Sequence, residues 1–123
     1  TGRPRRCGWL DLPALKYAVM LNGVTKLIMM KPDVLSGFDE LKVCHQYLVN
    51  GMSQKRIPYN IVNDVPTPEY ITCKGWHTDI SNLKSYNERP AELHHYVELI
   101  EKEMQVPVTI VSVGPDRTQT LIR

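Results

Sequence analysis

The 123-residue sequence has few of the features that mark disulfide-bonded, metal-binding or membrane proteins. Its three cysteines, Cys7, Cys44 and Cys73, are odd in number, widely spaced and without a Cys-x-x-Cys pair. A disulfide framework and a zinc site are therefore not expected, and the thiols should be reduced, as in the cytosol. No run of eighteen apolar residues predicts a membrane span, and no signal peptide or transit segment is visible.

An excess of charge is also lacking, because the formal net charge is only +2 at pH 7. A positive charge this small does not argue for nucleic acid as a partner. The sequence is 42% hydrophobic and 23% charged, which is typical of a globular protein, and its length suffices for one core. We therefore expect a single domain over residues 1–123. The absence of an initiating methionine and the start in a loop suggest part of a larger protein.

A short apolar run over residues 27–30 ends abruptly at Lys31, Pro32 and Asp33. The run predicts a buried strand that stops before the proline, which cannot continue a central ladder. Lys31 and Asp33 would project from the carboxyl end of this strand, where open α/β sheets bind ligands. An aspartate there can accept hydrogen bonds from N1–H and the 2-amino group of guanine, and adenine lacks this donor edge. Taken alone, the two residues are more simply interpreted as solvated charges.

Two helices are predicted. The first is capped by Asp11, has Pro13 in its first turn, and ends at Asn22-Gly23. The second opens at Pro90, ends before Pro107, and places its apolar residues at helical spacing. The apolar residues of the first helix that lie off its main apolar face are also expected to pack; they are Tyr17, Met20 and Leu21.

Further strands are predicted at 41–49, 69–73, 108–111 and 118–122, with a turn at Asn50-Gly51. Helices that alternate with strands are typical of an α/β fold, here with a mixed sheet and flanking helices. The segment 50–68 is predicted to be a long excursion, and 76–89 a loop with a helical turn that is mobile unless something packs on it. The first is expected to pack down through its apolar side chains, which are Ile57, Tyr59, Ile61 and Val62.

The strand predicted at 108–111 also ends in a loop with potential ligand groups, Ser112, Val113 and Gly114. If this strand lies beside 27–30 in one sheet, both loops open at the same edge. The N–H groups of Val113 and Gly114 would then be able to donate to a carbonyl of the base that Asp33 holds.

The opening loop, residues 1–6, contains three arginines. Composition leaves two interpretations open. The loop is either a basic patch for nucleic acid or a fork-shaped site for a carboxylate or phosphate, which guanidinium groups bind bidentately.

The histidines form no metal-binding pattern. Cys44 and His45 are neighbours on a predicted strand and should point to opposite faces, while His94 and His95 are consecutive on a helix. We therefore predict no metal site among these residues.

Three motifs, in this order and spacing, resemble the C-terminal part of adenylosuccinate synthetase. They are Thr-Gly-Arg-Pro-Arg-Arg-Cys-Gly-Trp-Leu-Asp at 1–11, Lys-Pro-Asp-Val-Leu-Ser-Gly at 31–37, and Ser-Val-Gly-Pro-Asp-Arg at 112–117. The similarity covers essentially the whole chain. It implies the C-terminal portion of the P-loop-like fold of that family, about the last third of the enzyme.

The resemblance implies that the full-length protein is a cytoplasmic, homodimeric ligase. Such an enzyme joins IMP and L-aspartate to form adenylosuccinate, with GTP and Mg²⁺, on the way to AMP. A phosphoryl group passes first to the 6-oxygen of IMP, which the amine of aspartate then displaces. The implied partners are small molecules, without nucleic acid or membrane.

The same resemblance assigns roles to residues of this chain. The aspartate and IMP loop would comprise Thr1, Gly2, Arg3, Pro4 and Arg5, which favours anion binding for the arginines. The GTP contacts would come from Arg5, Lys31, Pro32, Asp33, Ser112, Val113 and Gly114. In this family the glycine-rich phosphate loop, the catalytic aspartate and the catalytic histidine belong to the N-terminal portion. The resemblance therefore implies no catalytic residue and no metal ligand within this chain, and Mg²⁺ would be bound by the N-terminal portion.

The sequence departs from the family at one of these motifs. The triplet is more commonly Lys-Leu-Asp preceded by threonine, whereas Met30 and Pro32 flank Lys31 here. Pro32 removes a backbone donor but leaves both side chains. The alternatives to a ligase fragment are a non-catalytic nucleic-acid-binding module that uses 1–6 and 55–56, and a dimer-forming domain.

Overall fold

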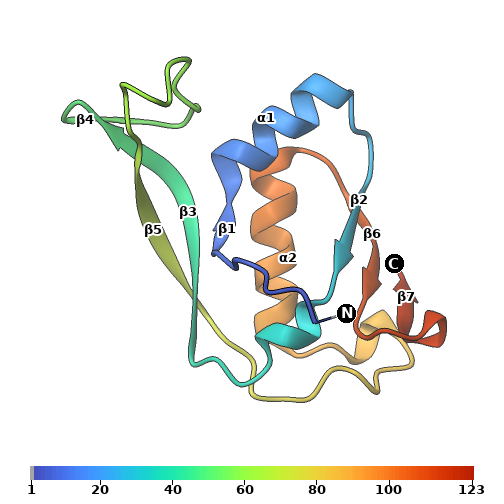
Figure 1. Ribbon diagram of the computed structural model, residues 1–123. Coiled ribbons are helices and arrows are strands. Elements are labelled where there is room, and N and C mark those ends of the chain that lie inside the picture. The colour runs from blue at the N-terminus through green and yellow to red at the C-terminus, as the bar shows by residue number, and fades with distance from the viewer. Residues whose placement is uncertain (1) are drawn as a thin grey trace.

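The structure is a computed structural model that describes residues 2–123. Two helices, α1 and α2, lie between two small sheets (Figure 1). The mixed α/β class predicted from the sequence is confirmed, with the strands divided between two sheets. The helices are α1 (Leu12–Asn22) and α2 (Ala91–Met104), and the short 3-10 helices are η1 (Pro32–Leu35), η2 (Tyr86–Glu88) and η3 (Arg117–Gln119).

The first sheet is built on a long antiparallel pair, β3 (Glu40–Val49) and β5 (Thr67–Lys74). The short strands β1 (Leu10–Asp11) and β4 (Met52–Gln54) also pair with β3. The predicted turn between β3 and β4 is confirmed, because Asn50 and Gly51 have φ values of 51° and 79°. Positive φ at both positions is what a two-residue hairpin turn requires.

The second sheet holds β2 (Leu27–Met30), β6 (Val108–Ser112) and β7 (Thr120–Ile122), with β6 in the middle. β2 and β6 are parallel, and Met30 lies opposite Ser112. The strand predicted at 27–30 is confirmed, but the expectation of full burial is wrong: Ile28 and Met30 are 57% and 65% exposed. Side chains alternate between the two faces of a strand, and only the face of β2 that carries Leu27 and Met29 meets the core.

Helix α1 begins and ends where the sequence predicts. The Asp11 carboxylate accepts a hydrogen bond from the Ala14 N–H at 2.9 Å, and Gly23 closes the helix with φ 57°. The expectation that the off-face apolar residues pack is wrong. Tyr17, Met20 and Leu21 are 49%, 66% and 63% exposed, because α1 contacts α2 and β3 through its other side.

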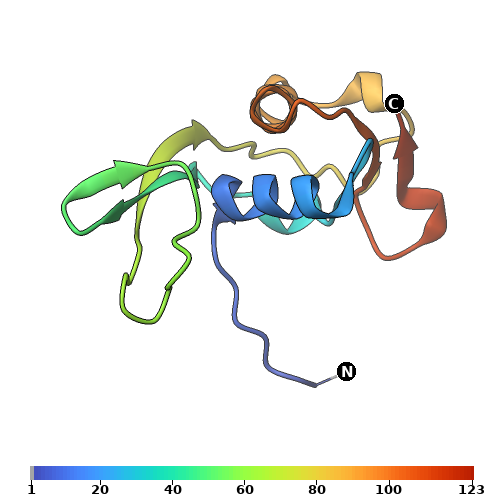
Figure 2. The same cartoon turned by 90° about the horizontal axis from the view of Figure 1, so that it is seen from above.

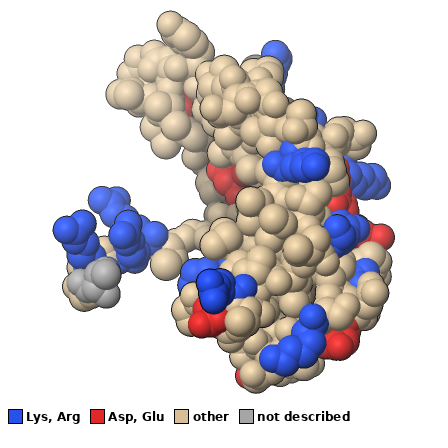
Figure 3. Space-filling view, turned by 90° about the vertical axis from the view of Figure 1, so that its right-hand side faces the viewer, with Lys and Arg blue, Asp and Glu red and all other residues tan. Residues whose placement is uncertain are grey.

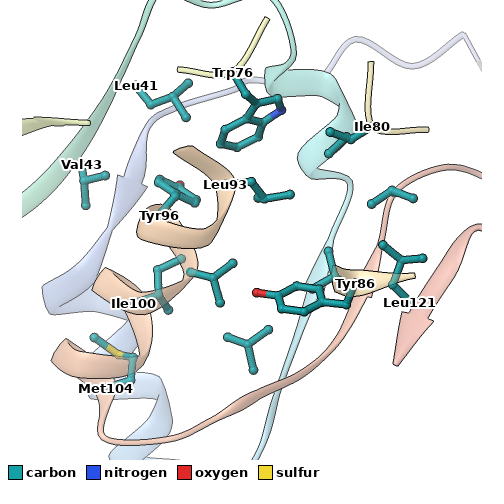
Figure 4. Close-up of a cluster of buried hydrophobic side chains, with 14 of the residues drawn as sticks. Leu41, Val43, Trp76, Ile80, Tyr86, Leu93, Tyr96, Ile100, Met104 and Leu121 are labelled. Atoms are coloured by element: carbon teal, nitrogen blue, oxygen red, sulfur yellow. The ribbon is translucent and has the colours of Figure 1, made fainter. Parts of the chain in front are cut away.

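Helix α2 lies at the centre of the core. Its apolar residues Leu93, Tyr96, Val97, Ile100 and Met104 are all buried, as their helical spacing predicts. They pack against strand residues of both sheets and against side chains of the 76–89 segment (Figure 4). One core therefore joins the two sheets.

The two excursions differ from each other. Segment 76–89 packs closely, and Trp76, Ile80 and Tyr86 are 1%, 0% and 5% exposed (Figure 4). Within segment 50–68, the part between β4 and β5 does not pack as predicted. Of its apolar residues, Ile57 touches the small cluster beside β3, whereas three others stand in solvent, namely Tyr59, Ile61 and Val62. Within the described residues, no helix has the length and apolar character needed to cross a membrane.

Candidate functional site

The parallel pairing of β2 and β6 brings the two predicted ligand loops to one edge. The pairing continues one residue past the strands, since the Lys31 N–H donates to the Ser112 carbonyl at 2.8 Å. The loop after β2 and the loop after β6 therefore start from the same point. This confirms the predicted neighbourhood of the two strands.

Lys31 and Pro32 turn the chain sharply out of β2. Lys31 adopts a left-handed backbone conformation, with φ 60° and ψ 41°. A residue other than glycine adopts this conformation at a cost of about 1–2 kcal/mol. A following proline disfavours the right-handed helical region for Lys31. Pro32 is buried in the first turn of η1, where its missing N–H leaves no helical hydrogen bond unmade. The departure from the family triplet thus fits the local backbone.

Asp33 carries an unpaired acceptor at this edge. Its side chain is 21% exposed, and its Oδ2 lies 4.0 Å from the ammonium of Lys31. Its Oδ1 is buried and accepts no hydrogen bond from any group of residues 2–123. A buried acceptor without a donor costs about 1–3 kcal/mol. A ligand that supplies donors would recover this energy, and the side chain would have to rotate to present both oxygens.

The segment around Trp76 fixes η1 in place. The Trp76 indole N–H donates to the Ser36 hydroxyl at 3.1 Å, and the Gly37 N–H donates to the Trp76 carbonyl at 3.0 Å. A Cβ on Gly75 would lie 1.8 Å from the Phe38 carbonyl oxygen, so the backbones approach as only glycine permits. Because Trp76 is itself in the core, the Asp33 turn is rigidly supported.

The second loop leaves the end of β6 directly. Ser112, Val113 and Gly114 are buried at the end of β6, and the Ser112 hydroxyl donates to the Gly114 carbonyl at 3.3 Å. The Val113 N–H donates to the Gln119 carbonyl at 2.8 Å and is therefore already paired within the chain. Within the described chain the Gly114 N–H has no hydrogen-bond partner, which leaves it as the free donor of the pair.

Gln119 is a residue that the sequence reasoning missed. Its Oε1 accepts from the Asp116 N–H at 3.0 Å and its Nε2 donates to the Ser81 carbonyl at 3.0 Å. A Cβ on Gly114 would lie 2.2 Å from the same Oε1. Asp116 and Gln119 form a capping box on η3, a pattern visible in the sequence as Asp-x-x-Gln. The Thr118 hydroxyl and N–H lower the pKa of Asp116.

The arginine loop lies apart from this edge. Thr1 falls outside the described residues, and Gly2, Arg3, Pro4 and Arg5 form an exposed arm. Figures 2 and 3 show that the arm projects away from the rest of the molecule, with its basic side chains together at the end. The structure therefore does not bring the arginines to the strand-end loops.

Two of the histidines pair with charged side chains. His94 lies between Arg89 and Glu98, with its Nδ1 2.8 Å from the guanidinium and its Nε2 3.2 Å from the carboxylate. Since arginine can only donate, Nδ1 is the acceptor and Nε2 carries the proton. His77 pairs with exposed Asp39 at 3.3 Å. Over residues 2–123, no group of three or more potential ligand side chains could hold a metal ion.

The strand-end site does not include the groove beside α1. A groove of about 640 Å³ lies elsewhere, between α1 and the 55–57 segment, and none of its lining residues belongs to the two loops. Lysine and arginine from both sides border this groove, but its position separates it from the Asp33 carboxylate.

Comparison with known proteins gives a consistent result. The family model described as adenylosuccinate synthetase matches residues 1–121. Curated adenylosuccinate synthetases of Flavobacterium johnsoniae and Flavobacterium psychrophilum are 58% and 57% identical over 123 residues. The match covers 100% of this chain and 29% of each relative, so the chain spans less than a third of their length.

A solved structure agrees with these relatives. It is described as fully ligated adenylosuccinate synthetase from Plasmodium falciparum, and it superposes with a TM-score of 0.91 at 33% identity. The alignment covers 98% of this chain and 30% of that one.

Proposed function

This chain belongs to the adenylosuccinate synthetase family, and on that premise we propose that it is the guanine-recognising C-terminal portion of a GTP-dependent ligase. The full-length enzyme would join IMP and L-aspartate to form adenylosuccinate, and release GDP and phosphate, in the synthesis of AMP. We propose that it acts as a cytoplasmic homodimer on small molecules, without nucleic acid or membrane.

The parallel pairing of β2 with β6 is the observation that carries this proposal. The two loops that follow these strands leave the same edge of the sheet. One loop carries a carboxylate oxygen of Asp33 and the other the N–H of Gly114, and neither group has a hydrogen-bond partner among residues 2–123. Guanine presents two donors, N1–H and the 2-amino group, beside one acceptor, O6. An acceptor and a donor at one edge match this pattern, and adenine reverses it at positions 1 and 6.

The remaining loop residues have supporting parts in the proposal. The half-exposed Lys31 side chain offers its methylene stem to the face of the base. Pro32 and the Ser112–Gly114 segment shape the loops around it, and Val113 contributes through its backbone position. The proposal assigns the arginine arm, Thr1 to Arg5, to IMP and the carboxylates of aspartate, with Arg5 near GTP.

The phosphoryl chemistry lies outside these residues in the proposal. Mg²⁺ would neutralise phosphate charge when bound, and the described residues offer no cluster of carboxylates or histidines to hold it. This chain's part in the reaction would be to select the base and fix its orientation. Neither a nucleic-acid-binding module nor a dimer-forming domain gains support from the geometry of this edge.

Nucleotide binding tests the proposal. Isothermal titration of the full-length enzyme is expected to show GTP binding at least about tenfold tighter than ATP, because adenine would leave the Asp33 carboxylate unpaired. The 123-residue chain alone should bind GTP weakly and catalyse no turnover, since it would lack the phosphate contacts. Equal binding of GTP and ATP, or tight ATP binding, would overturn the guanine assignment.

A further inference from the structure

The side chain of Gln119 lies directly against Gly114. The amide of Gln119 bridges two separate segments: it accepts from the Asp116 N–H at 3.0 Å and donates to the Ser81 carbonyl at 3.0 Å. Its own carbonyl accepts from the Val113 N–H at 2.8 Å. Every polar group of Gln119 that faces this loop therefore has a partner.

The contact with Gly114 is unusually close. A Cβ built on Gly114 would lie 2.2, 2.4 and 2.6 Å from Oε1, Cδ and Nε2 of Gln119, so the amide plane covers the side of the glycine where a side chain would stand. The Ser112 hydroxyl donates to the Gly114 carbonyl at 3.3 Å. The Gly114 N–H belongs to the peptide between Val113 and Gly114. The Val113 N–H before this peptide and the Gly114 carbonyl after it are both hydrogen-bonded, and Gln119 covers one side of Gly114, so these contacts restrict how the peptide can turn.

We propose that Gln119 is a positioning residue for recognition of the 6-oxygen of guanine, since its side-chain amide aims the Gly114 N–H at that atom. This inference rests on the proposed function. The inference extends the proposed function by assigning base selectivity at position 6 to a side chain that does not touch the nucleotide. Asp33 binds the groups at positions 1 and 2 of the base, whereas Gly114 binds the group at position 6. Base analogues changed at one of these positions can therefore separate the two contributions.

Two analogues separate these parts. ITP retains O6 and N1–H but lacks the 2-amino group, so it reports on Asp33. The nucleotide 6-thio-GTP retains N1–H and the 2-amino group but carries sulfur, a weaker acceptor, at position 6. A residue that positions the Gly114 N–H should therefore affect the preference for GTP over 6-thio-GTP and leave the preference for GTP over ITP unchanged.

The experiment measures kcat and KM of the full-length enzyme with the three nucleotides for wild type and Gln119→Met. Methionine retains bulk against Gly114 but removes both side-chain hydrogen bonds. We expect the KM for GTP to rise about fivefold, the size of one neutral hydrogen bond, with kcat nearly unchanged. The preference for GTP over 6-thio-GTP should fall by a similar factor.

Gln54→Met is the matched control. Gln54 is a partly buried glutamine on β4, in the other sheet, with one side-chain hydrogen bond to a backbone carbonyl at 3.2 Å. It should leave both preferences as in wild type. If Gln119→Met does not fold, Gln119→Glu replaces it, because a carboxylate still accepts from the Asp116 N–H, while repulsion from the Ser81 carbonyl takes the place of the donated hydrogen bond. A reduced preference over 6-thio-GTP in that variant supports the proposal.

The outcomes are distinguishable. If wild type does not prefer GTP to either analogue, the proposed function itself fails. If wild type prefers GTP and the folded Gln119 variant keeps its full preference over 6-thio-GTP, only the role of Gln119 is overturned. A loss of preference over ITP as large as that over 6-thio-GTP would also overturn it, because a general loosening of the edge would then explain both.

Discussion

Replacing Asp33 with asparagine should move stability and GTP affinity in opposite directions. In the free protein, Asp33 Oδ1 is buried without a donor from residues 2–123, and Lys31 at 4.0 Å offsets only part of the charge. A neutral amide of the same shape costs less to bury than an unpaired carboxylate. Asp33→Asn is therefore expected to raise the free energy of unfolding of the ligand-free protein by about 1 kcal/mol.

The same substitution should weaken GTP binding strongly. Guanine would lose charge-assisted hydrogen bonds, each worth about 1.5–3 kcal/mol, and an asparagine NH₂ would face its donors. A loss of about 3 kcal/mol corresponds to roughly a hundredfold in affinity. Xanthine carries a carbonyl at position 2, which the asparagine NH₂ can donate to, so XTP should become the better substrate.

The assay compares the KM values for GTP and XTP in the full-length enzyme, together with chemical unfolding in the absence of nucleotide. Asp39→Asn is the control, because Asp39 is an exposed carboxylate six residues further along the chain. It should change neither the nucleotide preference nor the stability by more than about 0.5 kcal/mol. An unchanged preference for GTP over XTP in Asp33→Asn would refute the reasoning, as would an equal shift in the control.

Two further predictions concern the first sheet. Asp11 accepts hydrogen bonds from the Ala14 N–H at 2.9 Å and from the Tyr47 hydroxyl at 2.6 Å. Asp11→Ala removes a helix cap and leaves the hydroxyl unpaired. The free energy of unfolding, measured in urea, should therefore fall by about 3 kcal/mol, which is the sum of the two losses. A loss below 1 kcal/mol would contradict this sum. Burial, and then the charge of Asp11, raise the pKa of the Cys44 thiol. Alkylation of Cys44 at pH 8 should therefore be slower than alkylation of the exposed Cys7, and its rate should increase as the pH rises. Equal alkylation rates for the two thiols in the native protein would refute this.

Local sequence signals predicted most of the fold because their physical causes are local. Asp11 and Gly23 mark the ends of α1 through their own capping geometry, and Asn50-Gly51 defines its turn through two positive φ values. The apolar period of α2 predicted its five buried residues correctly. In each case the deciding interaction spans only a few residues.

Predictions that depended on what surrounds a residue were less successful. Apolar residues such as Tyr17 and Tyr59 were expected to pack, but burial requires a neighbouring surface. The described chain leaves Tyr17 half exposed and Tyr59 fully exposed. At the candidate site, the loops and Asp33 were identified from strand-end positions. The partner of the Val113 N–H was not identified, because this hydrogen bond depends on how η3 folds back onto the loop. The Asp-x-x-Gln pattern at 116–119 could have indicated that fold-back.

One segment, residues 76–81, connects the two loops of the proposed guanine site and is anchored in the core by Trp76 and Ile80. Trp76 donates to Ser36 beside the Asp33 turn, and five residues later the Ser81 carbonyl accepts from Gln119 beside Gly114. Both anchor points flank or belong to core residues, since Trp76 and Ile80 are 1% and 0% exposed. A shift of this segment would therefore displace the acceptor and the donor of the edge together. The spacing between them, on which recognition of a purine depends, is set by the hydrophobic core rather than by either loop alone.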